Sequence, residues 1–167
     1  MRKVNNKGYT LVELIVVIVI VGIMASSLVV GIKHFMDLNV TYGMQSLQAT
    51  LDETRYTTMT KGDSVVKCVI EQRNDMYYAI VTTSDTDEKV VKLFDSRYPL
   101  YYYSDITSYL VDDTNKITII FNKNDGSLKS VNYNLANVPI SISDNYIESN
   151  GVKLDIAQLT GRTLLND

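Results

Sequence analysis

The residues best placed to do chemistry lie near the start of the chain, where one carboxylate stands at the edge of a long apolar run. Arg2, Lys3 and Lys7 come first, and Glu13 then precedes residues 14–32, which contain no charged side chain. A helix rises about 1.5 Å per residue, so this run reaches roughly 28 Å, close to the hydrocarbon thickness of a bilayer. A carboxylate at the edge of such a run is costly to bury, so Glu13 requires a functional explanation.

Two general interpretations account for the apolar run alone. A secretory signal peptide has a basic start, an apolar core and small residues near a cleavage site, as at residues 25–27. A plain signal anchor needs only the run, with its basic end in the cytoplasm. Neither interpretation explains Gly8 directly before the aromatic Tyr9, or the carboxylate of Glu13.

A third interpretation explains these residues together. Residues 8–14, with the sequence GYTLVEL, resemble the cleavage motif of type IV pilins and the related pseudopilins. In that family a membrane aspartyl peptidase cuts after the glycine and methylates the new N-terminus. The resemblance implies cleavage between Gly8 and Tyr9, N-methylation of Tyr9, and an assembly role for Glu13. Glu13 would be the fifth mature residue and would pair with the terminal amine of an adjacent subunit, a charge pair whose gain is partly offset by desolvation.

The same resemblance implies partners and a location. The partners are the prepilin peptidase and methyltransferase, other pilin or pseudopilin subunits, an assembly platform membrane protein and, indirectly, an assembly ATPase. The chain would cross the cytoplasmic membrane once, with its N-terminus inside, and would then enter an extracytoplasmic filament. Two positions depart from the family pattern: Tyr9 stands where phenylalanine is commonest, and Gly31 stands where many major pilins have a proline. Gly22 matches a common family glycine.

The remaining polar residues do not form a recognisable catalytic or metal site. His34 is the single histidine, which leaves no second histidine for a metal pair. The acidic groups at residues 85–88 and 112–113 lack the glycine-centred spacing of a calcium loop, and residues 122–126 have Lys123 where an oxygen ligand belongs. We therefore expect no metal, no cofactor and no enzymatic activity.

Charge argues against a general affinity for nucleic acid. The 167 residues carry a formal charge of −3 from 16 basic and 19 acidic side chains. Three basic residues belong to the leader, which leaves 13 against 19, a formal charge of −6 on the rest of the chain. Such a body repels phosphate backbones unless a local basic patch exists. The single cysteine, Cys68, allows no intramolecular disulfide and is expected as a small buried strand residue.

The C-terminal region adds a second, shorter resemblance. Residues 150–156, followed by the Thr-Gly-Arg triplet at residues 160–162, resemble the closing hairpin of minor pilins grouped with the H-type pseudopilin of type II secretion. Some members of that group bind DNA through basic residues near this end. Lys153 and Arg162 are the candidates for a weak DNA contact here, but Asp155 and Asp167 lie beside them, so direct nucleic-acid binding is not expected. A purely local interpretation is that Gly161 makes a turn and Arg162 pairs nearby.

The apolar pattern predicts one long helix and then strands. Val40, Met44, Leu47 and Leu51 recur at helical spacing, and Gly62 should end the helix. Strands are expected over residues 64–70, 76–83, 89–94, 116–122, 127–134, 138–147 and 152–156. Asp-Gly at residues 125–126 and Asn-Gly at residues 150–151 predict hairpin turns. Polar connections are expected at residues 71–75 and 84–88. Residues 98–109 are expected to form either an edge strand or an ordered loop.

The predicted fold class is α+β, with a pilin-like long N-terminal helix packed on an antiparallel sheet domain. The expected divisions are a cleaved leader (1–8), a transmembrane and filament-core helix (9–32), an amphipathic helical extension (33–61) and an extracytoplasmic β-rich domain (62–167). The function that fits best is a minor pilin or pseudopilin that serves protein secretion, DNA uptake (competence), adhesion or motility. The alternative is a membrane-anchored extracytoplasmic binding domain with an uncleaved signal anchor.

Overall fold

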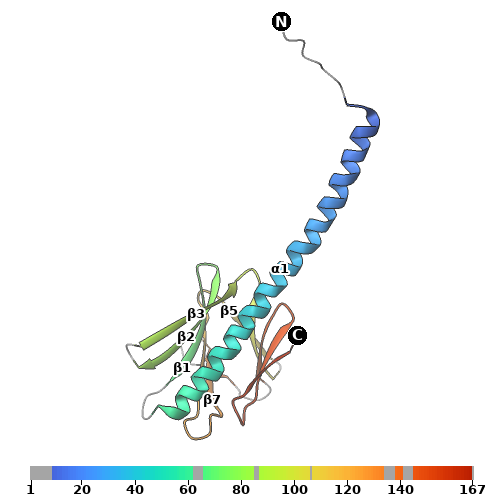
Figure 1. Cartoon of the computed structure of the whole chain (residues 1–167). Helices are drawn as coiled ribbons and strands as arrows, with labels where there is room; N and C mark the ends of the chain where they lie inside the picture. The colour runs from blue at the N-terminus through green and yellow to red at the C-terminus, as the bar shows by residue number, and fades with distance from the viewer. Residues whose placement is uncertain are drawn as a thin grey trace. The chain divides into compact units, whose positions relative to one another are not determined.

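The structure, a computed structural model, describes residues 9–61, 66–84, 87–105, 107–133, 138–140 and 145–166, without the side chains of residues 27–37, 84, 138 and 139. The chain divides into two compact units, Met1–Asp37 and Leu38–Asp167, and each is described by itself. Within the described residues, one helix, α1 (Leu11–Thr60), precedes eleven strands (Figure 1). A search of these residues finds no helix long and apolar enough to cross a membrane. The predicted helix stop, Gly62, lies outside the described residues, and α1 ends two positions before it.

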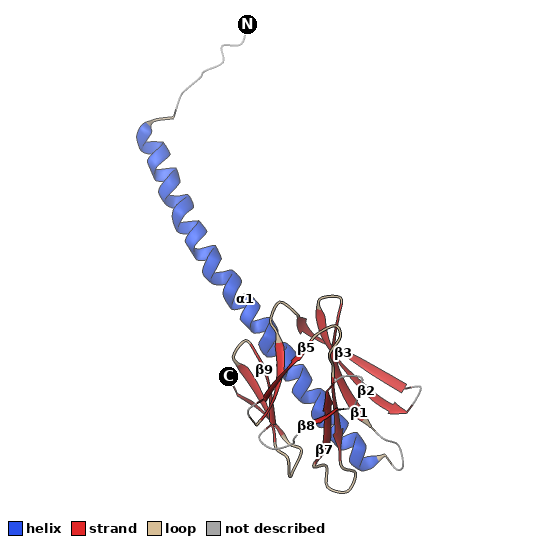
Figure 2. Ribbon diagram, turned by 180° about the vertical axis from the view of Figure 1, so that it is seen from behind, coloured by secondary structure: helices blue, strands red, loops and turns tan. Residues whose placement is uncertain are grey.

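The second unit contains two antiparallel sheets beside the C-terminal part of α1 (Figure 2). The six-stranded sheet has the order β3-β2-β1-β6-β7-β8, and its strands are β1 (Lys67–Arg73), β2 (Met76–Ser84), β3 (Asp87–Asp95), β6 (Ile117–Phe121), β7 (Leu128–Tyr133) and β8 (Val138–Ile140). The five-stranded sheet has the order β11-β10-β9-β4-β5, and its strands are β4 (Leu100–Ser104), β5 (Thr107–Val111), β9 (Asn145–Ser149), β10 (Val152–Ile156) and β11 (Thr163–Asn166). The predicted α+β class and the order of helix before strands are therefore confirmed.

The predicted apolar stripe of the helix forms part of the core. Its four members are fully buried: Val40, Met44, Leu47 and Leu51. Three threonines on the same side extend the buried surface, because Thr50, Thr54 and Thr58 each donate a hydrogen bond of 2.7 Å from Oγ1 to the carbonyl four residues earlier. A hydroxyl bonded in this way can be buried without leaving an unpaired polar group. Cys68 is buried in β1, as predicted.

The two predicted hairpin turns are confirmed. Gly126 has φ +69° between β6 and β7, and Gly151 has φ +84° between β9 and β10. A third tight turn was missed, because residues 71–75 were interpreted as one polar connection. In fact β1 continues to Arg73, and Asn74 and Asp75, with φ values of +48° and +59°, form the whole turn into β2. Asparagine and aspartate tolerate this left-handed conformation better than most residues, so the signal was present.

Three other expectations need correction. Residues 138–147 do not form one strand, because β8 pairs with β7 in one sheet and β9 pairs with β10 and β4 in the other. Residues 98–109 are neither a single edge strand nor a loop, because they contain interior strand β4 and most of edge strand β5. Ser84 and residues 87–88, expected in a turn, belong to β2 and β3. Finally, β11 was not predicted at all.

Two sets of contacts join the sheets. The buried hydroxyl of Tyr77, on β2, donates to the Val111 carbonyl at 3.1 Å and accepts from the Leu100 N–H at 3.1 Å. A tyrosine of the six-stranded sheet therefore completes the ladder between β4 and β5. Loss of that hydroxyl would leave two main-chain groups without their partner in a buried place.

The second contact brings two turns and the helix together. Arg55 donates from Nε to the Gly126 carbonyl at 3.1 Å, and the Leu128 N–H donates to the Gln158 carbonyl at 3.0 Å. Gly161, with φ +62°, packs so closely that a Cβ atom there would overlap the Gly126 carbonyl oxygen. The turn between β6 and β7 and the loop between β10 and β11 are thus in direct contact.

Candidate functional site

The predicted assembly residue, Glu13, caps its own helix. Its Oε2 accepts hydrogen bonds of 2.8 Å from both the Thr10 N–H and the Thr10 hydroxyl, and the Glu13 N–H donates to Thr10 Oγ1 at 3.3 Å. This reciprocal arrangement is a capping box, which satisfies free N–H groups at a helix N-terminus. Thr10 was missed as a member of the site, although the Thr-x-x-Glu spacing is its sequence signal. Within the part of the chain that the structure describes, Oε1 of Glu13 accepts no hydrogen bond.

The helix that follows this cap presents apolar side chains on all of its sides. The apolar residues from Leu11 to Met24 are between 50% and 76% exposed. A helix that is apolar all round is normally buried in lipid or against other helices. Tyr9, the predicted first mature residue, is 88% exposed and precedes the helix. Gly8 and the leader cations Arg2, Lys3 and Lys7 lie outside the described residues.

The described residues bring together no cluster of three His, Cys, Asp or Glu side chains able to hold a metal ion. Asp125 is instead used within its turn, where the backbone N–H and the hydroxyl of Ser127 donate to it and lower its pKa. Asp112 likewise accepts hydrogen bonds from Thr114 and Asn115. The side chain of His34 lies outside the described set.

The two candidate DNA contacts lie in different surroundings. Lys153 Nζ lies 3.9 Å from Glu148 Oε2 and 5.0 Å from the centre of the Tyr146 ring, so a carboxylate already compensates its charge. Arg162 lies in the loop between β10 and β11, on the rim of a groove that also contains Asp155. Lys153 therefore has a carboxylate close by, and Arg162 shares the lining of its groove with Asp155.

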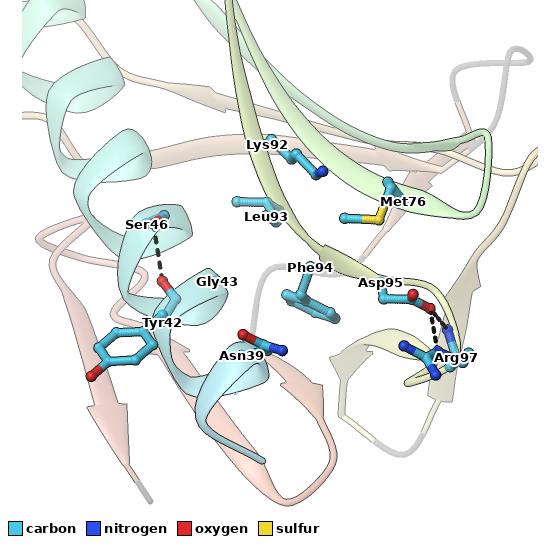
Figure 3. A pocket seen from close by; sticks show the side chains of 10 residues that line it. All are labelled: Asn39, Tyr42, Gly43, Ser46, Met76, Lys92, Leu93, Phe94, Asp95 and Arg97. Carbon is cyan, nitrogen blue, oxygen red and sulfur yellow. Dashed lines mark hydrogen bonds and ion pairs between the residues drawn. The ribbon is translucent and has the colours of Figure 1, made fainter. Parts of the chain in front are cut away.

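An open groove lies between α1 and β3 in the second unit (Figure 3). Its volume is about 370 Å³, and its wall is tight at Gly43, where a Cβ atom would overlap Phe94. The charged groups on its rim are Lys92 and the ion pair of Asp95 with Arg97, whose Nε lies 3.0 Å from Asp95 Oδ1. Hydrogen bonds from the Arg97 side chain and N–H lower the pKa of Asp95. These groups form a surface ion pair, and the groove contains no arrangement of nucleophile and base.

Comparison with known proteins identifies the start of the chain. Residues 3–29 match the family model of the prokaryotic N-terminal methylation motif, the signature of type IV prepilins and pseudopilins. The match covers 27 of the 167 residues and includes Gly8, Tyr9 and Glu13. The resemblance noted in the sequence is therefore confirmed for this segment. No significant match was found among curated proteins or solved structures.

Proposed function

We propose that the chain is a structural subunit, a minor pilin or pseudopilin, of a type IV filament system. The observation that carries this proposal is the methylation motif at residues 3–29, which is followed by a helix with apolar side chains on every side. In this proposal the chain performs no catalysis and is itself the substrate of the prepilin peptidase. The two-sheet domain that follows the helix in the sequence would form the globular head of the subunit.

In this proposal the apolar run at residues 14–32 lies first in the membrane and later in the filament core. It first holds the precursor in the cytoplasmic membrane, with the basic leader inside and the sheet domain outside, as the excess of positive charge before the run favours. It then becomes part of the filament core after extraction by an assembly platform and its ATPase. Part of the run lies beyond the described side chains, so the membrane-spanning role is argued from the sequence.

Glu13 guides docking between subunits in this proposal. Cleavage after Gly8 removes the leader cations and creates a free amine on Tyr9. The capping box occupies Oε2 of Glu13, and Oε1 is left for the amine of a neighbouring subunit. A charge-assisted hydrogen bond in apolar surroundings is stronger than one in water, so it can select the register between subunits. The filament so built serves protein secretion, DNA uptake, adhesion or motility.

Mass spectrometry of the mature N-terminus tests the processing step. We expect a chain that begins at N-methylated Tyr9, and we expect a Gly8→Val variant to stay uncleaved. An intact Met1 in the wild type, or cleavage near residues 25–27, would overturn the proposal and favour a signal anchor or a signal peptide.

Filament assembly tests the role of Glu13 separately. Glu13→Ala should be cleaved normally but should yield less than about a tenth of the wild-type filament. A charge-assisted contact contributes about 1.5–3 kcal/mol, so its loss should lower association roughly tenfold or more. The matched control is Glu53→Ala, which removes an exposed carboxylate from the same helix, where it pairs with Lys89. If Glu13→Ala assembles as well as Glu53→Ala, Glu13 does not guide docking.

A further inference from the structure

Two tyrosine rings lie face to face on the outer side of the five-stranded sheet. Tyr103 of β4 and Tyr146 of β9 are paired across the two strands, and their ring centres are 4.6 Å apart with planes that differ by 9°. Both side chains are partly exposed, whereas their neighbours along each strand are buried. Small molecules can therefore reach the pair from solvent.

The two strands hold the phenol ends of these tyrosines side by side. Side chains of directly paired residues leave a sheet on the same face, with Cβ atoms about 4.5–5.5 Å apart. With nearly parallel rings at this spacing, the ring carbons next to the two hydroxyls face each other. Strand β9 lies between β4 and β10, so the Lys153 ammonium of β10, which is 5.0 Å from the centre of the Tyr146 ring, contacts this ring from the other side. Tyr146 is thus held between a cation and Tyr103.

Two other tyrosine contacts in the described part of the chain have a different geometry. The ring centres of Tyr109 and Tyr133 are 5.0 Å apart with planes at 57°. Those of Tyr101 and Tyr103 are 6.0 Å apart with planes at 50°. In a tilted pair the edge of one ring meets the face of the other, so the carbons next to the two hydroxyls do not face each other. Of these three contacts, only the stacked one brings the phenol ends together in parallel.

We propose that Tyr103 and Tyr146 form a site of oxidative cross-linking, at which a peroxide activated by a haem peroxidase joins the two rings as dityrosine. Each phenol gives up one electron and its hydroxyl proton. One hydrogen peroxide takes both electrons and both protons and leaves as two water molecules. The two phenoxyl radicals then form one carbon–carbon bond between the carbons next to their oxygens, and the two protons on these carbons move to the oxygens.

This cross-link supplies a covalent tie that the cysteine content of the chain does not allow. The single cysteine, Cys68, is buried in β1, so the chain forms no internal disulfide. A bond between β4 and β9 closes a long loop of the chain, which lowers the entropy of the unfolded state as a disulfide does. The inference goes beyond the filament role and does not depend on it, because both rings belong to one chain.

The test is oxidation of the full chain, diluted in detergent micelles, by hydrogen peroxide and a haem peroxidase. Trypsin should then release residues 98–116 joined to residues 130–153, which mass spectrometry should find in the monomer fraction together with dityrosine fluorescence. Tyr103→Phe and Tyr146→Phe should both lose this joined pair of peptides, because phenylalanine has no hydroxyl to oxidise. Absence of the joined pair from the oxidised wild type would overturn the proposal.

Tyr133→Phe is the matched control, because the same two peptides also contain the tilted pair of Tyr109 and Tyr133. The hydroxyl of Tyr133 donates to the Leu110 carbonyl, so circular dichroism should first confirm that this variant is folded. Oxidised Tyr133→Phe should still yield the joined pair of peptides. Loss of the joined pair from Tyr133→Phe, or its persistence in Tyr146→Phe, would show that the stacked rings are not the site.

Discussion

Replacement of Gly161 by alanine should destabilise the fold, because Gly161 lies where the loop between β10 and β11 contacts the turn between β6 and β7. Gly161 has φ +62°, a left-handed conformation that costs a residue with a Cβ atom about 1–2 kcal/mol. The new Cβ would also overlap the Gly126 carbonyl oxygen and lie 3.0 Å from Phe121 Cδ1 and 3.1 Å from Arg55 Cδ. Forcing one extra carbon into a packed place costs about 1–3 kcal/mol. The expected loss for Gly161→Ala is therefore about 2–5 kcal/mol.

Gly151 is the matched control for this prediction. It has φ +84°, but no atom lies within 4 Å of the position that a Cβ would take. Gly151→Ala should therefore lose only the conformational part, about 1–2 kcal/mol. Thermal unfolding of the full chain in detergent, followed by circular dichroism, should show Gly161→Ala melting roughly 3–10 °C below Gly151→Ala. Equal melting temperatures would refute the close contact, and the Thr-Gly-Arg triplet would then need an explanation other than packing.

Two further predictions concern buried groups of the second unit. Tyr77→Phe should lower the free energy of unfolding by about 1–3 kcal/mol in denaturant titrations, because the Val111 carbonyl and the Leu100 N–H would lose their buried partner. An unchanged midpoint of the denaturant titration would contradict this prediction. Burial raises the pKa of Cys68 to about 12, so the folded chain should resist iodoacetamide near pH 8 while the unfolded chain reacts. The pKa of Cys68 is higher in the folded chain than in the unfolded chain, so the buried thiol contributes its full stability below about pH 9. The free energy of unfolding should therefore fall between about pH 9 and 12. Cys68→Ala should not show this fall.

The features predicted correctly from the sequence are those that short-range patterns specify. The helical stripe from Val40 to Leu51 follows from spacing, and the turns at Gly126 and Gly151 follow from residues that accept positive φ. The motif at residues 3–29 also depends only on local sequence. In each case the residues that decide the structure lie within one or two turns of chain.

The missed features depend on contacts between distant segments. A strand pattern shows which side chains point inward but does not say which sheet receives the strand, so residues 138–147 were assigned to one strand although β8 and β9 pair in different sheets. Strand β11 was missed because it has only four residues; it pairs with the nearby β10, and bonds of Gln48 and Asp52 to Thr163 tie it to a helix more than a hundred residues away. The bridging hydroxyl of Tyr77 likewise has no local sequence signature.

The capping box changes the physical argument for Glu13 in the proposed filament. A lone carboxylate at the edge of an apolar run would lose its hydration without compensation, whereas the Thr10 N–H and hydroxyl already supply two hydrogen bonds to Oε2. The same bonds fix the carboxylate at the helix N-terminus, where the helix dipole favours negative charge. The terminal amine of a neighbouring subunit then has to stabilise a carboxylate whose Oε2 already accepts two hydrogen bonds and whose position is fixed. Selection between registers follows more readily from such a preorganised acceptor than from a freely rotating side chain, because little conformational entropy is lost when the amine binds.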